Sequence, residues 1–325
     1  MKTIAFFNNK GGVGKTTLVY HFTFMLAELG YRSLAVDLDP QANLTSMFLS
    51  EERLVEIYER ESSTRQTLLE SIRPLDRGIG DIKPAYIHPI SDKIGLLAGD
   101  LDLSLFEDKL SANWGKCLDG DEAAFRIVSS FFRIITEASS RFNADFNIID
   151  IGPNFGAINR ATLIATDFVV VPMAADLFSL QGLKNLGNRL DTWHNEWADR
   201  SKRNPEQSLD LPIGQMKPLG YVVMQHGIKE KRPVQSYLKW ANRIPQVFKQ
   251  FVLKESASPE TKIGDDQYCL ALLKHYHSLI PMAMEARKPI FLLKPSDGAI
   301  GAHLGAVRNS YDDFQNLTRR IISLS

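Results

Sequence analysis

Cysteine is nearly absent from this sequence, and so are long apolar runs and any net charge. The 325 residues include two cysteines, Cys117 and Cys269, with no Cys-x-x-Cys pair. This indicates two ordinary buried thiols in a reducing compartment and excludes a cysteine-ligated iron–sulfur cluster. No apolar run is long enough to span a bilayer, and Met1 leads into a predicted strand without a secretory signal pattern. We therefore expect a cytoplasmic protein.

The charge balance excludes a protein that binds nucleic acid through bulk positive charge. The 38 basic residues are cancelled by 38 acidic residues, which still leaves room for a local basic face. Hydrophobic residues make up 44% of the chain and charged residues 23%, as in ordinary globular proteins. The length suits one large α/β domain or two small ones.

A glycine-rich loop between a strand and a helix is the most informative stretch of the chain. Apolar residues at 3–7 predict a buried strand, and apolar residues at helical spacing from Leu18 to Leu29 predict a helix. The sequence KGGVGKTT lies between them, at residues 10–17. A strand, a glycine loop and a helix in this order are the context of a phosphate-binding P-loop.

The residue types of this loop explain why it would bind phosphate. Glycines lack a Cβ, so the backbone can turn its N–H groups toward an anion, and the following helix adds its positive end. Lys15 is placed to reach the β- and γ-phosphates, Thr16 to bind Mg²⁺ and Thr17 to reach the α-phosphate. Asn9 stands where the usual motif has a glycine. The predicted nucleotide-binding residues of the loop are Gly11, Gly12, Val13, Gly14, Lys15, Thr16 and Thr17.

Two further predicted strands end in carboxylates. The strand at 32–40 ends with Asp37 and Asp39, whose side chains project to the same side because they are two positions apart. The apolar strand at 146–150 ends in Asp150, the pattern of an acid that holds Mg²⁺. Ligands bind at the carboxyl edge of open α/β sheets. The alternative is that these acids only cap a helix or a turn.

Further strands and helices are predicted along the rest of the chain. The predicted strands lie at 94–100, 167–172 and 219–225, and the predicted helices at 123–140, from 178 to beyond 190 and at 311–324. We expect a single domain over residues 1–325, with polar surface insertions near 51–90 and 195–218. His275 and His277 are expected to be structural, on a helix where residues two apart do not share a face.

The loop at residues 10–17 resembles the deviant Walker A motif of the ParA/MinD (Soj-like) family of P-loop ATPases. The sequence DLDPQAN at 37–43 and the strand ending at Asp150 are also similar to that family, with weaker similarity at 167–187, 219–225 and 280–291. The resemblance implies a doubly wound, mostly parallel sheet flanked by helices. It also implies an ATPase that uses ATP and Mg²⁺ and forms a homodimer when ATP binds.

The resemblance assigns roles to individual residues. Lys10 would reach across the dimer to the partner's phosphates, and Asp39 would orient the attacking water. The expected catalytic residues are Lys10, Lys15 and Asp39, and the expected metal-binding residues are Thr16, Asp37 and Asp150.

The resemblance also concerns the adenine and the loop after Asp150. The end of the strand at 219–225 would lie beside the adenine, where Met224 either gives an apolar contact or packs in the core. The backbone near Pro281 and Met282 would flank the base. Family members more often have a proline where Gly152 stands, so this loop lacks an expected source of stiffness.

Basic residues gather after the strand at 219–225. They are Lys229, Lys231, Arg232, Lys239, Arg243 and Lys249, interleaved with Tyr237 and Trp240, and are followed later by Arg287, Lys288, Arg319 and Arg320. Partition ATPases similar to this one bind DNA without sequence preference, through phosphate contacts. A solvated helix surface is the plainer interpretation of such a cluster.

The predicted function is therefore that of a ParA-like partition or positioning ATPase in plasmid or chromosome segregation, stimulated by a ParB-like or other partner protein. One alternative is a MinD-like positioning ATPase that binds membranes through its final helix, although no lysine-rich tail follows that helix. Others are the ATPase subunit of a defence or secretion operon, and a metabolic enzyme similar to dethiobiotin synthetase. Metabolic relatives usually lack the equivalent of Lys10.

Overall fold

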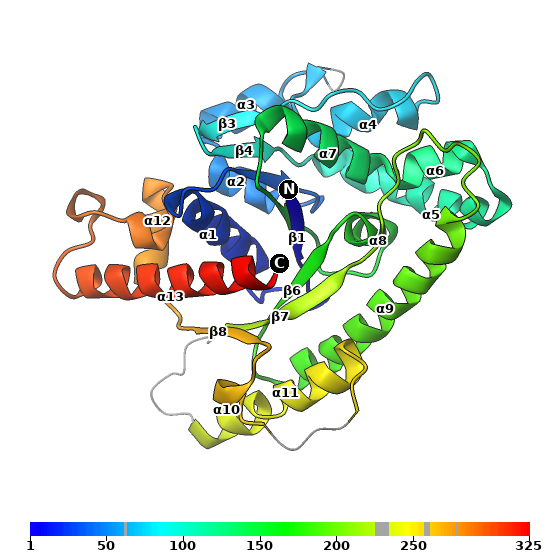
Figure 1. Cartoon of the computed structure of the whole chain (residues 1–325). Helices are drawn as coiled ribbons and strands as arrows, with labels where there is room; N and C mark the ends of the chain where they lie inside the picture. Colours follow the sequence, from blue (N-terminus) through cyan, green and yellow to red (C-terminus); the bar gives the residue numbers. More distant parts are fainter. Residues whose placement is uncertain (62–63, 225–233, 257–260, 277) are drawn as a thin grey trace.

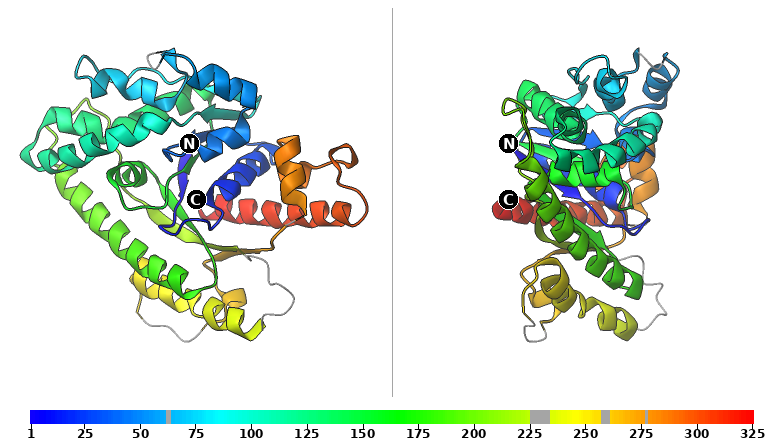
Figure 2. Two further views of the ribbon diagram at one scale, coloured as in Figure 1. Left: turned by 180° about the vertical axis from the view of Figure 1, so that it is seen from behind. Right: turned by 90° about the vertical axis from the view of Figure 1, so that its right-hand side faces the viewer.

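One twisted sheet runs through the molecule, with helices packed on both of its faces (Figures 1 and 2). The computed structural model describes residues 1–61, 64–224, 234–256, 261–276 and 278–325. Within these residues the sheet has eight strands in the order β3-β4-β2-β5-β1-β6-β7-β8. Neighbouring strands are parallel except for the antiparallel pair β3 and β4. The predicted doubly wound, mostly parallel α/β fold is confirmed.

The predicted strands are found close to their expected positions. The strands are β1 (Lys2–Phe6), β2 (Ser33–Asp37), β3 (His88–Ser91), β4 (Ile94–Leu97), β5 (Phe146–Asp150), β6 (Phe168–Met173), β7 (Lys217–Met224) and β8 (Cys269–Leu273). The sequence pattern predicts neither β3 nor β8. Both are edge strands, and β3 has only four residues, among them Pro89. The sequence of β8, CLALL, is apolar throughout, but so short a run does not distinguish a strand from a buried helix segment.

The register of the central strands brings the acids together. Every residue of β2 and β5 is buried, as in parallel strands covered on both faces. Asp37 at the end of β2 is level with Asp150 at the end of β5, which in turn is level with Phe6 at the end of β1. The glycine loop and the two acids therefore share the carboxyl edge of the sheet.

Side chains of successive strand residues point to opposite faces and enter two separate apolar cores. Ala5 and Phe7 belong to one core, and Ile4 and Phe6 to the other. The first core is covered by α4 (Leu68–Asp76), α5 (Glu107–Lys116), α6 (Glu122–Val128), α7 (Ser130–Phe142), α8 (Ala157–Ile164), α9 (Leu177–Ser201), α10 (Val234–Ala241) and α11 (Ile244–Val247). The second is covered by α1 (Lys15–Glu28), α2 (Asn43–Phe48), α3 (Glu51–Tyr58), α12 (Leu279–Ala286) and α13 (Ala302–Leu324).

The single helix predicted over 123–140 is wrong, because the chain breaks it at Ser129 into α6 and α7. The Ser129 hydroxyl donates to the carbonyl of Phe125 at 2.7 Å. The break shifts the helical register, so that Phe131 is fully buried and Phe132 is only partly covered.

The segment 195–218 differs from the predicted surface insertion. Helix α9 continues to Ser201, and β7 already begins at Lys217. Trp197 lies within this segment yet is fully buried, and its indole N–H donates to the carbonyl of Pro212 at 2.8 Å. The polar composition of the segment therefore gives no sign that Trp197 packs it against the core.

The final helix packs into the core of the protein. Helix α13 begins at Ala302, well before the predicted start, and Phe314, Leu317 and Ile321 along it are buried. A MinD-like membrane-binding role would need this apolar face, which is already covered. Within the described residues, no helix combines the length and apolar character needed to cross a bilayer.

Two helical glycines give a matched test of packing. A Cβ at Gly187 of α9 would collide with the carbonyl of Phe251 in the neighbouring turn η4 (Phe248–Val252), whereas a Cβ at Gly115 of α5 meets nothing within 4 Å. We expect Gly187→Ala to lower the free energy of unfolding by about 1–3 kcal/mol. Gly115→Ala should raise it, by up to about 1 kcal/mol. Urea unfolding measures both, and equal shifts would contradict this packing.

Candidate functional site

The glycine loop joins β1 to α1 and adopts backbone angles that favour glycine. Gly12 and Gly14 have φ values of +71° and +80°. Helix α1 starts at Lys15 without a side-chain cap and without an acidic residue in its first turn. Its first N–H groups are therefore available to an anion.

Lys15 is a buried cation among carboxylates. Lys15 is only 7% exposed, and this burial lowers the pKa of its ammonium group. The nearby charges of Asp150 and Asp39 act in the opposite direction and favour the charged ammonium. The structure thus brings together three predicted site residues.

Asp150 has the surroundings expected of a residue that serves a metal ion. Neither carboxylate oxygen has a partner with good hydrogen-bond geometry among the described residues, although both are buried. Burial raises the pKa of Asp150, followed by the charge of Asp37, while the neighbouring Thr16 hydroxyl lowers it. An unpaired buried carboxylate beside a hydroxyl fits Mg²⁺, which needs few protein ligands because phosphates and waters complete its shell. The described residues contain no group of three or more His, Cys, Asp or Glu that holds a metal by itself.

Asp37 is tied to the segment that follows β2. Its Oδ2 accepts hydrogen bonds from the backbone N–H and the hydroxyl of Thr45, at 2.8 and 2.7 Å. The same hydroxyl accepts from the N–H of Gly99 at 2.8 Å, and the Gly99 carbonyl accepts from Tyr58 at 2.9 Å. Burial raises the pKa of Asp37 above its ordinary value. Asp37 therefore orders this edge through Thr45, and its part in a metal shell stays a prediction.

Asp39 lies close to the loop that follows Asp150. Its Oδ1 accepts from the N–H of Gln41 at 3.1 Å. A Cβ built at Gly152 would lie 3.3 Å from this oxygen, closer than ordinary contact. Glycine at 152 thus permits the two loops to touch.

Lys10 is held within its own chain by residues that the sequence patterns do not identify. Its Nζ lies 2.5 Å from Oδ2 of Asp176 and 3.4 Å from the Ser179 hydroxyl. Asp176 also caps α9, because its Oδ1 accepts from the N–H of Ser179 at 2.8 Å. An acid just before a predicted helix is the signal that could have located it.

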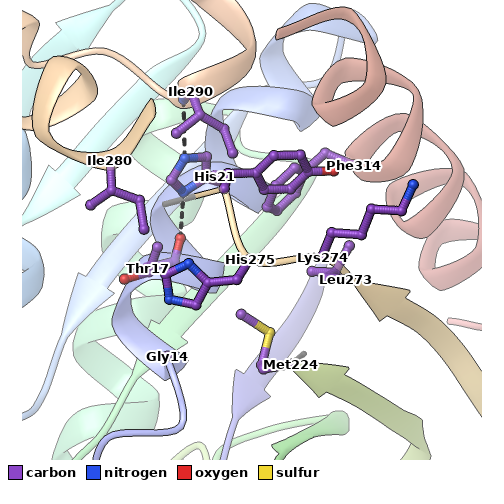
Figure 3. Close-up of a pocket in the computed structure, with 11 residues that line it drawn as sticks. Gly14, Thr17, His21, Met224, Leu273, Lys274, His275, Ile280, Ile290 and Phe314 are labelled. Carbon is purple, nitrogen blue, oxygen red and sulfur yellow. Dashed lines mark hydrogen bonds between the residues drawn. The ribbon is translucent and has the colours of Figure 1, made fainter. Parts of the chain in front are cut away.

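A pocket opens next to the glycine loop, as Figure 3 shows. Of the residues predicted to lie beside the adenine, Met224 lines this pocket and Pro281 and Met282 do not, so their adenine contacts stay a prediction; Ile280 lines it instead. The reason is that α12 begins at Leu279, so successive side chains turn to different sides and Pro281 faces solvent. His275, predicted to be structural and helical, lies in the loop after β8 and lines the same pocket, whereas His277 lies outside the described residues.

His21 is a pocket residue that no sequence pattern signals. Its Nε2 accepts from the N–H of Ile290 at 3.1 Å, so its Nδ1 carries the proton and donates to the Thr17 carbonyl at 2.7 Å (Figure 3). The ring stacks on Phe314 at 4.9 Å. Because it is buried, the pKa of His21 falls to about 4. This neutral imidazole ties the helix after the glycine loop to the C-terminal part of the chain.

Several basic residues predicted to contact DNA have partners in the protein. Lys249 pairs with buried Asp266 at 3.7 Å, Lys288 with Asp297 at 2.8 Å, and Arg320 donates to the carbonyl of Gln267 at 2.7 Å. Arg287 donates to the carbonyl of Leu49.

The remaining basic residues are exposed or are not described. Arg319, Lys239 and Arg243 are exposed, and the last two flank the Trp240 ring at 5.5 and 5.3 Å. Lys229, Lys231 and Arg232 lie outside the described residues, as does the side chain of Tyr237.

The fold and the glycine loop are those of the P-loop nucleoside triphosphatases. Comparisons with known proteins identify the family within this class. The family model described as an AAA domain (AAA_31) matches residues 1–202. A protein of Methanocaldococcus jannaschii, MJECL24, is 30% identical over 72% of this chain and 76% of its own length. The virulence plasmid ParA family protein pGP5-D of Chlamydia psittaci is 30% identical over 66% of this chain and 75% of its own. The chain therefore belongs to the ParA/MinD family of P-loop ATPases.

Solved structures agree with this fold. Protein DIP2308 of Corynebacterium diphtheriae superimposes with a TM-score of 0.72 at 24% identity, over 100% of this chain and 98% of its own. An ATP complex of a McdA variant from Cyanothece has a TM-score of 0.64 at 17% identity, over 99% and 96%. Other curated relatives are matched over a smaller share, such as 52% of the Mycobacterium tuberculosis protein Rv1708.

The buried His21 predicts a pH dependence of stability. The unfolded chain binds a proton at His21 near pH 6.5, whereas the folded protein does so only near pH 4. The free energy of unfolding should therefore fall as the pH drops from 6.5 toward 4. His21→Gln keeps an acceptor for Ile290 but does not titrate. The stability difference between wild type and His21→Gln should shrink by roughly 2–3 kcal/mol from pH 7 to 4.5. Urea titrations at both pH values measure it, and a constant difference would refute the assignment.

Proposed function

We propose that this protein is a Mg²⁺-dependent ATPase that dimerises when it binds ATP and then binds DNA without sequence preference, in the partition or positioning of a plasmid or chromosome. The observation that carries the proposal is Lys10, which stands beside a complete P-loop and three buried acids at one sheet edge. A P-loop that served only its own chain would not need a second lysine at this place.

The surroundings of Lys10 support a second copy of the chain as its target. The Lys10 side chain is 32% exposed. Near it, at the start of α9, Leu177 and Phe178 are 54% and 76% exposed. Leu105, after β4, is 76% exposed as well. Exposed apolar side chains around a binding site are typical of an interface.

The residues present fit ATP and Mg²⁺, and each would contribute a defined action. The N–H groups of Gly12–Thr17 would hold the phosphates, and Lys15 would neutralise their charge. Thr16 and Asp150 would hold Mg²⁺, with Asp37 supporting the shell from behind through Thr45; the ion would neutralise charge on the phosphates. Asp39 would orient the attacking water. Met224, His21 and Ile280 would line the base site.

The DNA contact of this proposal rests on Lys239 and Arg243. Both are exposed, and Trp240 lies between them, whereas Lys249 is engaged with Asp266 and serves the fold. A ParB-like or other partner protein would stimulate hydrolysis, and the protein would act in the cytoplasm, on the nucleoid.

Lys15 and Asp39 have different proposed roles, so their variants should differ in ATP binding and in hydrolysis. Lys15→Ala should lose nucleotide binding, because the phosphates lose their buried cation. Asp39→Ala should bind ATP and remain dimeric, with hydrolysis reduced about 100-fold because water is no longer oriented. Fluorescent-nucleotide binding and phosphate release measure both. A fast Asp39→Ala ATPase would remove Asp39 from this role.

The experiment that tests the function is retention of the protein on a random-sequence DNA duplex. It is run with ATP, ADP or no nucleotide, across a salt titration. Binding only with ATP, fading steeply with salt, is expected because phosphate contacts release counterions. Absence of binding with every nucleotide, while ATP still causes dimerisation, would reject the DNA-binding proposal.

The double variant Lys239→Ala/Arg243→Ala locates the DNA contact. It should weaken binding to all sequences equally and lower the salt slope by about 2, because two phosphate contacts are lost. The matched control is Lys116→Ala/Lys202→Ala, which removes two exposed lysines, one at the end of α5 and one directly after α9. Figure 1 shows α5 near one end of α9 and α10 near the other. Equal losses in both variants would show that general charge, not this site, binds DNA.

A further inference from the structure

The loop after Asp150 needs support from outside its own sequence. It runs from Ile151 to Gly156 and contains glycine at 152, where the resembling family more often has a stiffening proline. Glycine widens the conformational freedom of such a loop. Pro153 and the hydrogen bond from the Gly156 N–H to the Asn154 side chain give the loop some local order, and contacts from α8 and α5 add to it.

Asn159 supplies the first of these contacts. It lies on α8 and is only 1% exposed. Its Nδ2 donates to the carbonyl of Gly152 and to the carbonyl of Asn154, each at 2.7 Å. One buried amide thus holds the loop at two points, and a buried carbonyl that lost this donor would be left unsatisfied.

Glu107 supplies the second contact by holding α8 itself. The N-cap of α8 is Gly156, which has no side chain to cap the helix. The Glu107 carboxylate, at the start of α5, accepts from the N–H of Ala157 and, at 2.8 Å, from that of Ile158. A negative group at a helix N-terminus is stabilising. Helix α5 belongs to the part of the chain, residues 51–145, to which sequence patterns assign no role.

The braced loop touches the residue expected to orient water. Gly152, whose carbonyl Asn159 holds, lies against Asp39: a Cβ there would be 3.3 Å from the Asp39 carboxylate. Phe155 of the same loop packs edge-on against Phe7, at the end of β1, with ring centroids 5.7 Å apart. A shift of the loop would therefore be felt at Asp39.

We propose that Asn159, braced by Glu107, is a positioning residue for ATP hydrolysis. It fixes the loop after Asp150 against Asp39, so that the water-orienting carboxylate keeps its place. This inference rests on the proposed ATPase function. Neither side chain lines the pocket beside the glycine loop, and both contact only the loop after Asp150 or the start of α8, so we expect them to act on the rate of hydrolysis and not on ATP binding.

The test compares steady-state hydrolysis and ATP-dependent dimerisation of the full chain. Asn159→Ala should lower kcat at least about tenfold, since small displacements of reacting groups cost this much or more. KM for ATP and dimerisation should stay within about twofold of wild type. Glu107→Gln keeps the shape but only one acceptor oxygen, and should show a smaller loss in the same parameter. If Asn159→Ala does not fold, Glu107→Gln alone provides the test.

Asn147→Ala is the matched control. Asn147 is also fully buried, lies on β5 and donates to the Thr3 hydroxyl at 3.0 Å, away from the carboxyl edge. It should lower the melting temperature without changing kcat. If Asn159→Ala and Glu107→Gln only lower the melting temperature and leave kcat unchanged, the inference is wrong. If the wild-type protein hydrolyses no ATP, the proposed function itself fails, and this inference with it.

Discussion

The carboxyl edge of the sheet brings one buried cation, Lys15, close to Asp39 and Asp150, with Asp37 level with Asp150, and the rest of the site depends on this arrangement. Burial lowers the pKa of Lys15 and raises those of Asp37 and Asp150. A buried carboxylate without a partner is costly in a folded protein. Binding of a cation and a phosphate would offset this cost, and the surrounding elements keep the site in place.

Contacts from neighbouring helices and loops perform that task. Thr45 and Gly99 fix Asp37 from the side of β4, and Asn159 fixes the loop after Asp150 from α8. Helix α9 carries Asp176, which holds Lys10, and its Gly182 lets Asn9 of the glycine loop approach closely: a Cβ there would lie 2.7 Å from the Asn9 side-chain oxygen. Helix α9 thus supports the glycine loop, whereas Thr45, Gly99 and Asn159 support the strand ends beside it.

Much of this could be predicted from the sequence. The glycine loop and the strands ending at Asp37 and Asp150 have strong local patterns, because parallel central strands are continuously apolar and the loop needs glycine. The residues that hold the site could not be predicted. His21 and Asp176 act through contacts with residues far away in the chain, and Asn159 holds a loop that lies five to seven residues before it. Nothing in the sequence around His21 or Asn159 distinguishes them from ordinary helix residues, and only its capping position gives Asp176 a local signal. Ile280 lines the pocket, and Pro281 and Met282 do not, because the start of α12 sets which side chain faces it.

The central claim is that Lys10 acts on a second copy of the chain. Sedimentation velocity of wild type and Lys10→Ala, each with Mg²⁺ and a non-hydrolysable ATP analogue, tests it most directly. The account predicts that both bind the analogue with similar affinity, that wild type becomes dimeric and that Lys10→Ala stays monomeric. Dimerisation of Lys10→Ala at the wild-type concentration range would contradict the claim and return Lys10 to the role of a loop lysine paired with Asp176.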